Sequence, residues 1–524
     1  MGPAPAAPRY ARRLGGARRG QPREAARLSQ VGRCAEGSRA RRPARRPIRR
    51  PRHPFLLYRG GPARGSAVHT RPHAALARLD LRHPHAHAPP EVSKPSLLYR
   101  LSVHVVTRAA PLVARFDKKV ARGLDGRRGL AARLGGWGSA ERDTKRPLIW
   151  MHAPSVGEGL QAKPVLETLR AEHPDWQLAF TFFSPSAERL AKNLPVDVAD
   201  YLPLDRPSEV SAVLDALQPT ALVFSKLDVW PELTLAAARR GVKLGLISAT
   251  VSPNSSRLRW PTRHWSAPAY RALDRVGTIS EEDGERLELL GARPETIAVT
   301  GDTRYDSVAE RAARLDTTRE PLARLAATSA DTFTIVAGST WPSDEAVLLP
   351  SFADLLHQLP TARLLLAPHE PNPDHLAAIA DRLRHLKLPR PVRLSQLEHA
   401  KPGPVIVVDR VGILADLYAL GDVAFVGGGF HRAGLHSVLE PAVFGVPTVF
   451  GPHWRMSRDA TLLLEQGGAV ALPADARHPL HSQWLVWHHD PAARRSAGKA
   501  AKTMVEEGRG ASERTTALVR GLVS

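Results

Sequence analysis

The sequence predicts an α/β protein with two Rossmann-like domains that face each other across a cleft. Short apolar, β-rich segments alternate with helical patterns from about residue 147 onward, and this alternation is typical of parallel sheets covered by helices. A polar stretch rich in Arg and Ala, roughly 307–330, divides the alternation into two series. A basic stretch without such segments precedes them, so we also expect a disordered N-terminal tail.

The candidate strands fall into these two series. The first series consists of the segments 148–151, 178–183, 221–224, 243–247 and 275–279. The second series consists of the segments 333–336, 363–367, 405–408, 423–426 and 448–450. We therefore expect an N-terminal Rossmann-like domain over 147–312 and a C-terminal Rossmann-like domain over 330–515.

The charge of the chain is concentrated at its N-terminus. Residues 1–95 contain 22 Lys and Arg against 4 Asp and Glu, whereas the rest of the chain contains 52 against 47. This tail is rich in Arg, Pro, Ala and Gly and lacks the apolar periodicity that would offset the entropy of ordering. The formal charge of +23 therefore does not indicate a nucleic-acid-binding body, and we expect no nucleic acid among the partners of the folded part.

Three interpretations of the tail stay open: contact with anionic lipid, contact with nucleic acid, and non-native sequence upstream of a later start codon. The tail has no apolar core after a short basic start, so it does not fit a secretory signal. The only cysteine, Cys34, lies in it. Residues 96–524 therefore contain no disulfide, no thiolate metal site and no cysteine nucleophile, which fits a reducing cytoplasm.

The segment 97–116 is mostly apolar but carries arginines at near-helical spacing and a proline, Pro111. It is too polar for a membrane span. It suits an amphipathic helix that lies on an anionic membrane surface, and a helix packed against the body of the protein is the alternative. Together with the basic, glycine-punctuated linker after it, it forms the region 96–146.

A run of three glycines, 427–429, ends the candidate strand 423–426. Such a break lets the backbone approach a ligand. Ser437 and Glu440 have the Ser-x-x-Glu spacing of a capping box, which predicts a helix from there to about Gly445. Free N–H groups at a helix start favour an anion, and the carboxylate suits ribose hydroxyls. We therefore expect a nucleotide-linked sugar here; a glycine-rich turn with a well-capped helix is the alternative.

Glu158 is the candidate general base. It lies in His152-Ala-Pro-Ser-Val-Gly-Glu158-Gly, directly after the first candidate strand. The carboxyl ends of parallel strands carry the ligand sites of such folds, and glycines on both sides leave room for a substrate hydroxyl that loses its proton to the carboxylate. The alternative is that Glu158 is only a favourable acidic residue in the first turn of a helix.

Several motifs together resemble one family, the 3-deoxy-D-manno-octulosonic acid (Kdo) transferases of lipopolysaccharide biosynthesis. The resemblance covers about residues 97–515, in the family's order. The motifs that carry it are the segments 150–164, 201–205, 226–231, 300–306, 338–341, 367–370, 409–412 and 421–453. An ordered set of this kind is far more specific than any single motif.

The resemblance implies a GT-B fold and an inverting glycosyltransferase that moves Kdo from CMP-Kdo to a lipid A precursor at the cytoplasmic face of the inner membrane. It assigns the general base to Glu158 and the two charge-stabilising positions to Lys226 and Arg304. It assigns CMP binding to Pro368, His369, Val411, Gly412, Ile413, Ser437, Val438, Leu439 and Glu440. It implies no cofactor, and the candidate strands contain no Asp-x-Asp that would require a metal.

The chain departs from the family's usual pattern at charged positions. Many members have Glu-Thr-Glu-Leu-Trp-Pro where this chain has Lys226-Leu-Asp228-Val-Trp-Pro, so an ammonium replaces a carboxylate. A branch with Lys-Tyr-Glu-Phe-Trp is closer, and Asp228 becomes the candidate for the remaining acidic function. Arg304 replaces a common Lys but keeps the charge, and Pro368-His369-Glu370 lacks the Arg of the common Pro-Arg-His.

Two other classes of protein stay open. A GT-B enzyme that uses a UDP-sugar, either a glycosyltransferase or an epimerase, would share the glycine loop of the second domain. A non-catalytic lipid- or nucleic-acid-binding protein would act through the basic tail. Competition between CMP and UDP for binding would distinguish a UDP-sugar enzyme from a Kdo transferase. A binding measurement on the body without its tail would test whether the protein acts only through the tail.

Overall fold

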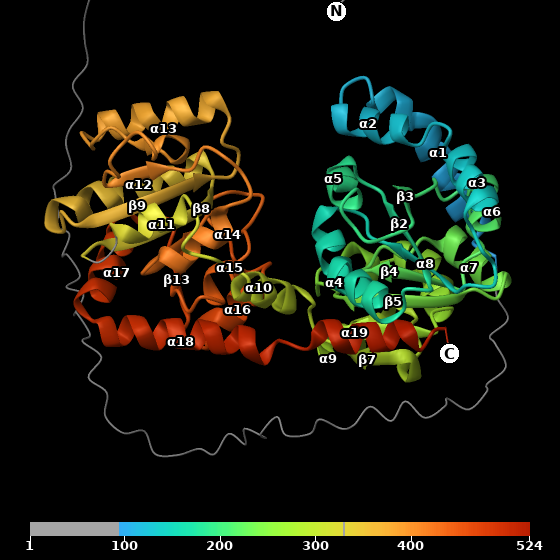
Figure 1. Cartoon of the computed structure of the whole chain (residues 1–524). Helices are drawn as coiled ribbons and strands as arrows, with labels where there is room; N and C mark the ends of the chain where they lie inside the picture. Colours follow the sequence, from blue (N-terminus) through green and yellow to red (C-terminus); the bar gives the residue numbers. More distant parts are fainter. Residues whose placement is uncertain (1–93, 329–330, 524) are drawn as a thin grey trace, which may run out of the picture. The chain divides into compact units, whose positions relative to one another are not determined.

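The computed structural model describes residues 94–328 and 331–523. The tail predicted over 1–95 lies outside the described residues, except for Lys94 and Pro95. Two seven-stranded parallel sheets with helices packed on them make up the described part (Figure 1). The predicted α/β fold with two Rossmann-like domains is therefore confirmed.

The first sheet has the strand order β3-β2-β1-β4-β5-β6-β7. Its direction of winding changes between β1 and β4, and ligands of such sheets bind outside the carboxyl ends of the strands at this point. All five residues of β1 and of β4 are buried. The strands are β1 (Leu148–His152), β2 (Gln177–Phe182), β3 (Val198–Tyr201), β4 (Ala221–Ser225), β5 (Lys243–Ala249), β6 (Arg275–Thr278) and β7 (Ile297–Val299).

Within the described residues, three helices precede this sheet and six connect its strands. The preceding helices are α1 (Leu97–Val113), α2 (Lys118–Gly126) and α3 (Leu130–Ala140). The connecting helices are α4 (Val156–Glu172), α5 (Glu188–Ala191), α6 (Pro207–Leu217), α7 (Pro231–Arg239), α8 (Thr262–Arg271) and α9 (Glu281–Leu290).

The second sheet has the strand order β10-β11-β9-β8-β12-β13-β14. Its winding changes between β8 and β12, so the loops after these two strands are the expected ligand site of this domain. The strands are β8 (Phe333–Thr340), β9 (Ala362–Pro368), β10 (Val392–Arg393), β11 (Val405–Val407), β12 (Val423–Val426), β13 (Thr448–Phe450) and β14 (Ala469–Ala471).

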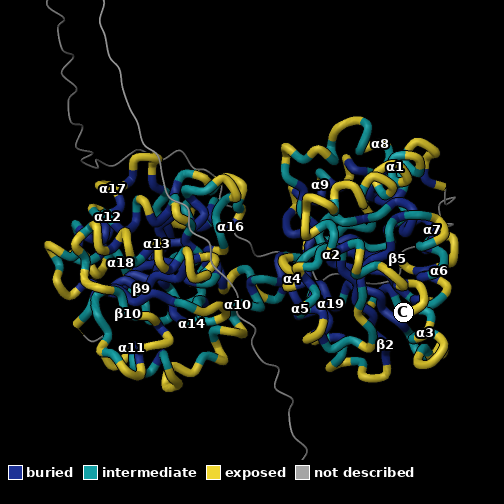
Figure 2. Tube along the Cα trace, turned by 90° about the horizontal axis from the view of Figure 1, so that it is seen from above, coloured by how far each residue is buried: buried dark blue, intermediate teal, exposed yellow. Residues whose placement is uncertain are grey.

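Helices accompany the second sheet and continue to the end of the chain. They are α10 (Arg304–Ala313), α11 (Leu322–Ala327), α12 (Pro342–Gln358), α13 (Pro373–His385), α14 (Leu414–Leu417), α15 (Leu439–Ala442), α16 (Arg458–Glu465), α17 (Arg477–His489), α18 (Pro491–Glu507) and α19 (Ala511–Arg520). Buried residues concentrate in the strands and in the helix faces toward them (Figure 2).

The last helix, α19, packs on the first domain. Leu518, Val519 and Leu522 are buried in the apolar core of the first sheet. Arg520 Nη1 lies 2.9 Å from a carboxylate oxygen of Glu172 at the end of α4. The last described helix therefore contributes apolar side chains to the core of the first domain.

Every predicted strand is present, with bounds that differ by a few residues at most. The described structure contains four further strands, β3, β7, β10 and β14. These four are the outermost strands of the two sheets. Edge strands are short and partly exposed, so they lack the continuous apolar run by which the inner strands were predicted.

The helix α1 is joined to the first domain by two polar contacts at its N-terminal turn. The Tyr99 hydroxyl donates to Asp205 Oδ2 at 2.6 Å. The Arg100 guanidinium forms a two-pronged ion pair with Glu232, at 2.7 and 2.8 Å. Asp205 also accepts the N–H groups of Glu232 and Leu233, both at 2.9 Å, and so caps α7. One buried carboxylate therefore fixes two helices.

Asp205 should make stability depend on pH in an unusual direction. Burial raises the pKa of Asp205 to about 6, against the opposing hydrogen bonds from Tyr99 and from two backbone N–H groups. A carboxyl group whose pKa is higher in the folded than in the unfolded protein contributes to the free energy of unfolding when the pH is below its ordinary pKa. This contribution is lost as the pH rises through about 6. Each pKa unit corresponds to about 1.4 kcal/mol, so the contribution is on the order of 2–3 kcal/mol.

The variant Asp205→Asn removes this titration while keeping a hydrogen-bond acceptor. As the pH rises from 4 to 6, native stability should therefore fall relative to that of the variant. Urea unfolding at several pH values measures the difference. Equal pH dependence of the two proteins in this range would contradict the assignment.

Candidate active site

Glu158 lies at the switch point of the first sheet. It is in the first turn of α4, which begins directly after β1. Ser155 is the N-cap residue of α4, and its hydroxyl oxygen accepts the N–H of Gly157 at 3.3 Å. The Ser155 hydroxyl also donates to Glu158 Oε2. The start of the helix therefore fixes the carboxylate at the carboxyl end of the sheet.

Lys226 comes directly after β4, the strand next to β1, and faces Glu158. Its ammonium nitrogen lies 3.1 Å from Glu158 Oε1. Burial alone would raise the pKa of Glu158, but the hydrogen bond from Ser155 and the ammonium of Lys226 outweigh it and hold the pKa below its usual value. Glu158 is therefore ionised at neutral pH, which a proton acceptor requires.

The backbone at Lys226 is in the left-handed region, with φ of 70°. A long side chain adopts this conformation only at a cost of about 1–3 kcal/mol, and such positions cluster at functional sites. The N–H of Lys226 donates to the carbonyl of Ile247 at 2.8 Å and so fixes the turn. The side chain of Lys226 is 43 % exposed, whereas that of Glu158 is 16 % exposed. The ammonium therefore lies on the solvent side of the pair.

Asp228, the second acidic candidate, already has partners from its own loop and from two other segments. It accepts the indole N–H of Trp230 at 3.0 Å and lies 3.3 Å from the Arg257 guanidinium and 3.5 Å from His152 Nε2. Burial would raise the pKa of Asp228, but His152, Arg257 and the indole N–H outweigh it and lower the pKa. Three neighbouring groups therefore already compensate the charge of this carboxylate.

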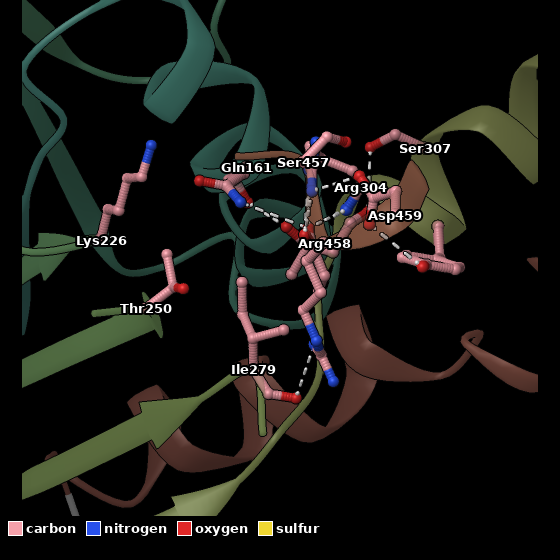
Figure 3. A network of polar contacts seen from close by, with 12 residues as sticks. Gln161, Lys226, Thr250, Ile279, Arg304, Ser307, Ser457, Arg458 and Asp459 are labelled. Atoms are coloured by element: carbon pink, nitrogen blue, oxygen red, sulfur yellow. Dashed lines mark hydrogen bonds and ion pairs between the residues drawn. The ribbon is translucent and has the colours of Figure 1, made fainter. Parts of the chain in front are cut away.

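Arg304 is the centre of a polar network (Figure 3). Its guanidinium lies 2.6 Å from Asp302 Oδ2 and 2.9 Å from Asp459 Oδ2. Gln161, one turn after Glu158 in α4, donates to Asp302 at 3.3 Å, and the Tyr305 hydroxyl donates to Asp459 at 3.2 Å. The network joins α4, α10 and α16.

The two carboxylates change what Arg304 can do. Burial would lower the pKa of the guanidinium, but Asp459 and Asp302 outweigh it and raise the pKa, so the group stays charged. Its charge is compensated by its neighbours. A phosphate or carboxylate of a substrate would therefore share Arg304 with these two aspartates. In Figure 3 no dashed line joins Lys226 to this network.

The glycine run 427–429 is held in place by contacts with other backbone segments and with Asp344. The N–H of Gly427 donates to the carbonyl of Gly338 at 2.8 Å, and the N–H of Gly428 donates to Asp344 at 2.8 Å. A Cβ on Gly427 would lie 2.2 Å from the carbonyl oxygen of Ser339. The run therefore allows backbone segments to pack closely on one another, and two of its N–H groups are not available to an anion.

The predicted capping box at Ser437 and Glu440 is wrong. The helix α15 begins at Leu439, its N-cap is Val438, and no side chain caps it. It spans only four residues, Leu439–Ala442, before a turn. So short a helix aligns few peptide dipoles, and the argument for an anion at its start loses its basis.

Two of the segments assigned to nucleotide binding meet in a cluster of rings. His369 comes directly after β9, and His436 precedes Ser437. The centroids of their imidazole rings lie 4.6 Å apart. Trp341 stacks on His369 at 4.6 Å and on His431 at 4.2 Å, and its indole N–H donates to His436 Nε2 at 3.1 Å. Burial, together with His369 and His431, lowers the pKa of His436 to about 4. His436 is therefore neutral near pH 7.

The third assigned segment, 411–413, is held from α10. Arg311 donates to the carbonyl of Gly412 at 3.0 Å and pairs with Asp416 at 2.9 Å. Burial raises the pKa of Glu440; the charge of Arg311 opposes this rise, and the charge of Asp416 adds to it. Arg311 and Asp416 thus lie close to both the segment that contains Gly412 and the segment that contains Glu440.

Sequence reasoning missed Asp344, which organises the glycine loop. This fully buried carboxylate accepts the N–H groups of Trp341, Gly428 and Phe430 at 2.9, 2.8 and 3.0 Å. The signal was present in the sequence, because a proline followed two residues later by an acidic residue is a helix-start pattern. Here that residue bridges from the helix start to the loop after β12.

Neither a metal-ligand cluster nor a bilayer-crossing helix occurs among the described residues. In the part of the chain that the structure describes, no three or more His, Cys, Asp or Glu side chains are grouped as metal ligands would be. Within 94–328 and 331–523, no helix has the length and apolar character needed to cross a bilayer.

The two sheets form a fold of the GT-B type. Its structure resembles one described as a UDP-N-acetylglucosamine 2-epimerase from Listeria monocytogenes, with a TM-score of 0.51, 14 % identity and coverage of 72 % of this chain and 96 % of the other. At this level of identity the similarity concerns the fold alone. The chemistry is indicated by relatives in sequence.

The family model for 3-deoxy-D-manno-octulosonic-acid transferases matches residues 127–307. The chain is 31 % identical over 379 residues to the Kdo transferase of Bordetella pertussis, covering 70 % of this chain and 85 % of the relative. It is 32 % identical over 335 residues to that of Chlamydophila psittaci, covering 62 % and 74 %. It is 27 % identical over 403 residues to that of Haemophilus influenzae, covering 75 % and 91 %. The chain belongs to the Kdo transferases, glycosyltransferases of lipopolysaccharide biosynthesis.

Proposed function

We propose that the protein transfers Kdo from CMP-Kdo to a lipid A precursor, with inversion and with Glu158 as the general base. The observation that carries this proposal is the ionised carboxylate of Glu158 at the switch point of the first sheet, fixed by Ser155 and paired with Lys226 at 3.1 Å. A carboxylate that is deprotonated and held in place is suited to take a proton from an attacking glucosamine hydroxyl.

Lys226 has a charge-balancing role in this proposal. The acceptor is expected to carry phosphate, and the donor carries a carboxylate, so a half-exposed ammonium beside the base suits either group. When a substrate anion pairs with the Lys226 ammonium, this charge no longer lowers the pKa of Glu158. Its basicity then rises at the moment when a proton must be accepted.

The CMP moiety is assigned to the second domain. The candidate residues are those of the loops after β9, β11 and β12, namely Pro368, His369, Val411, Gly412, Ile413, Ser437, Val438, Leu439 and Glu440. The contacts between His369 and His436 and between Arg311 and Gly412 support a common site for these loops. Arg304 is the candidate for the charge that develops on the departing phosphate.

The site of action proposed for the protein is the cytoplasmic face of the inner membrane. Support comes from α1, many of whose residues are exposed (Figure 2), apolar ones among them. Leu97, Val106 and Phe116 at or near this helix are 81 %, 65 % and 92 % exposed. An exposed apolar helix face with interspersed arginines suits the interface of an anionic membrane.

A transfer assay tests the proposal directly. Purified protein is incubated with CMP-Kdo labelled in the sugar and with an acylated glucosamine disaccharide phosphate. We expect labelled Kdo in the lipid fraction, and inhibition of transfer by free CMP but not by UDP at equal concentration. Hydrolysis without transfer, or inhibition by UDP alone, would exclude this function.

Glu440→Ala should weaken the binding of CMP. Hydrogen bonds to charged groups contribute roughly 1.5–3 kcal/mol, so the dissociation constant should rise by about 10- to 150-fold. Because Glu440 forms no helix cap, thermal stability should change little. Calorimetric titration with CMP measures the affinity, and Ser437→Ala, which removes an exposed hydroxyl, is the matched control for stability. Unchanged CMP affinity in a folded Glu440→Ala protein would remove this residue from the site.

A further inference from the structure

The first domain contains an apolar cavity of about 560 Å³ between α1, α2 and the loops after β2, β3 and β4. Its walls include Val103 and Val106 of α1, Val120 and Leu124 of α2, and the rings of Phe183 and Trp230. These two rings stack at 5.2 Å. The volume lies in the range of small-ligand sites, about 300–1,000 Å³.

Two charged groups that line the cavity, those of Asp205 and Arg127, already have partners. The carboxylate of Asp205 is occupied by the Tyr99 hydroxyl and two backbone N–H groups. The guanidinium of Arg127 donates to the carbonyls of Gly123, Leu202 and Phe183 and lies over the Phe183 ring. Both groups are therefore already satisfied and do not require a polar ligand. An occupant would gain affinity by burying apolar surface.

The cavity adjoins the candidate active site. Trp230 belongs to the loop after β4 that contains Lys226 and Asp228, and its indole N–H is bound to Asp228. Phe183 comes directly after β2, the neighbour of β1. Because the strands are parallel, these loops and the start of α4 lie at the same edge of the sheet as Glu158.

The open side of the cavity is both apolar and cationic. Val106 lines the cavity and is 65 % exposed, so the wall continues into the exposed apolar side of α1. Lys119 at the start of α2 also lines it and is exposed. An occupant that enters here should have a long apolar part and an anionic head.

We propose that this cavity holds one fatty-acyl chain of the acceptor while the sugar to which that chain is attached lies at Glu158. This inference rests on the proposed function, since it names the part of the acceptor that the first domain recognises. Acyl recognition then selects a lipid acceptor over a free glucosamine disaccharide. It also orients the acceptor, because the chain and the hydroxyl are fixed on the same edge of the sheet.

Filling the cavity tests this inference. Val103→Phe and Val120→Phe place an added ring in it from two different helices. Val105→Phe is the matched control, since Val105 lies on α1, is 58 % exposed and does not line the cavity. Binding of dodecanoate below its micellar concentration is measured by equilibrium dialysis with the full-length protein. Excluding two or three methylene groups should weaken binding by about 10- to 60-fold in both filled variants and by less than about twofold in the control.

Transfer kinetics give the second readout. The filled variants should raise KM for the acylated acceptor and leave kcat/KM for the deacylated disaccharide phosphate unchanged. Native dodecanoate affinity in both filled variants, or an equal loss with both acceptors, would overturn the inference. If the native protein transferred Kdo to neither acceptor, the proposed function would fail, whereas the dodecanoate measurement would still decide whether the cavity binds a chain.

Discussion

Glu158→Gln should lower the turnover of Kdo transfer by about two to four powers of ten, the usual contribution of a positioned general base. Glutamine keeps the shape of the side chain and can still accept the Ser155 hydroxyl, but it cannot take a proton at neutral pH. The loss should appear in kcat, with little change in the affinity for CMP-Kdo, because the proton moves as the transition state forms. Initial rates and calorimetric titration separate the two quantities.

The fold should tolerate this change. The ion pair that is lost involves Lys226, whose side chain is 43 % exposed, and exposed pairs contribute at most about 1 kcal/mol. The helix start is also preserved, because Ser155 caps α4 through its own hydroxyl oxygen. A thermal unfolding curve close to that of the native protein is therefore the expected result.

Asp228→Asn is the matched carboxylate control. Asp228 is bound by Trp230 and lies beside Arg257 and His152, so its loss should affect stability more than turnover. If Glu158→Gln turned over near the native rate while Asp228→Asn did not, the base would be Asp228. If Glu158→Gln failed to fold, Glu158 would be a structural residue of the first turn of α4.

The inner strands of both sheets could be predicted from the sequence, and the outer ones could not. An inner strand such as β12 is buried along its whole length, so all its residues are apolar. The edge strand β3 contains an exposed alanine and a half-buried aspartate before its buried tyrosine, and such a mixture is equally typical of a loop. Local composition therefore reports burial, and it identifies a strand where most of the residues are buried.

The same Ser-x-x-Glu spacing occurs at two places with different outcomes. At Ser155 and Glu158 the serine caps α4, and the two side chains bond to each other. At Ser437 and Glu440 the helix begins two residues after the serine and lasts four residues. The difference lies in the residues after the glutamate. The helix α4 spans seventeen residues over the sheet, whereas the turn that includes Gly445 ends α15 early.

The contacts that assemble the second domain's candidate site connect residues far apart in the chain. Arg311 reaches Gly412 from α10, and His369 meets His436 across two loops. No local pattern indicates such pairs, since each residue alone fits a solvated helix face or a turn. The sequence could indicate which loops matter, because they lie at the carboxyl ends of strands near the switch point. The side chains that hold those loops together required the tertiary structure.

Asp344→Ala should give the largest loss of stability in the second domain. The carboxylate is fully buried and accepts three backbone N–H groups, two of them in the loop after β12. Removing it leaves these donors without a partner in the interior, and each buried unsatisfied group costs about 1–3 kcal/mol. We therefore expect the free energy of unfolding to fall by at least about 3 kcal/mol. Urea unfolding at pH 7 measures it.

The neighbouring Ser343→Ala is the matched control. Ser343 lies in the same first turn of α12, and its buried hydroxyl has no hydrogen-bond partner among the described residues, so its removal should change stability by less than about 0.5 kcal/mol. The glycine loop carries His431 and His436 into contact with Trp341. Asp344→Ala should therefore also weaken CMP binding at temperatures where the variant is still folded. A variant that unfolds with the native protein and binds CMP equally well would mean that the loop is held by its glycine-mediated backbone packing, and that Asp344 does not organise the site.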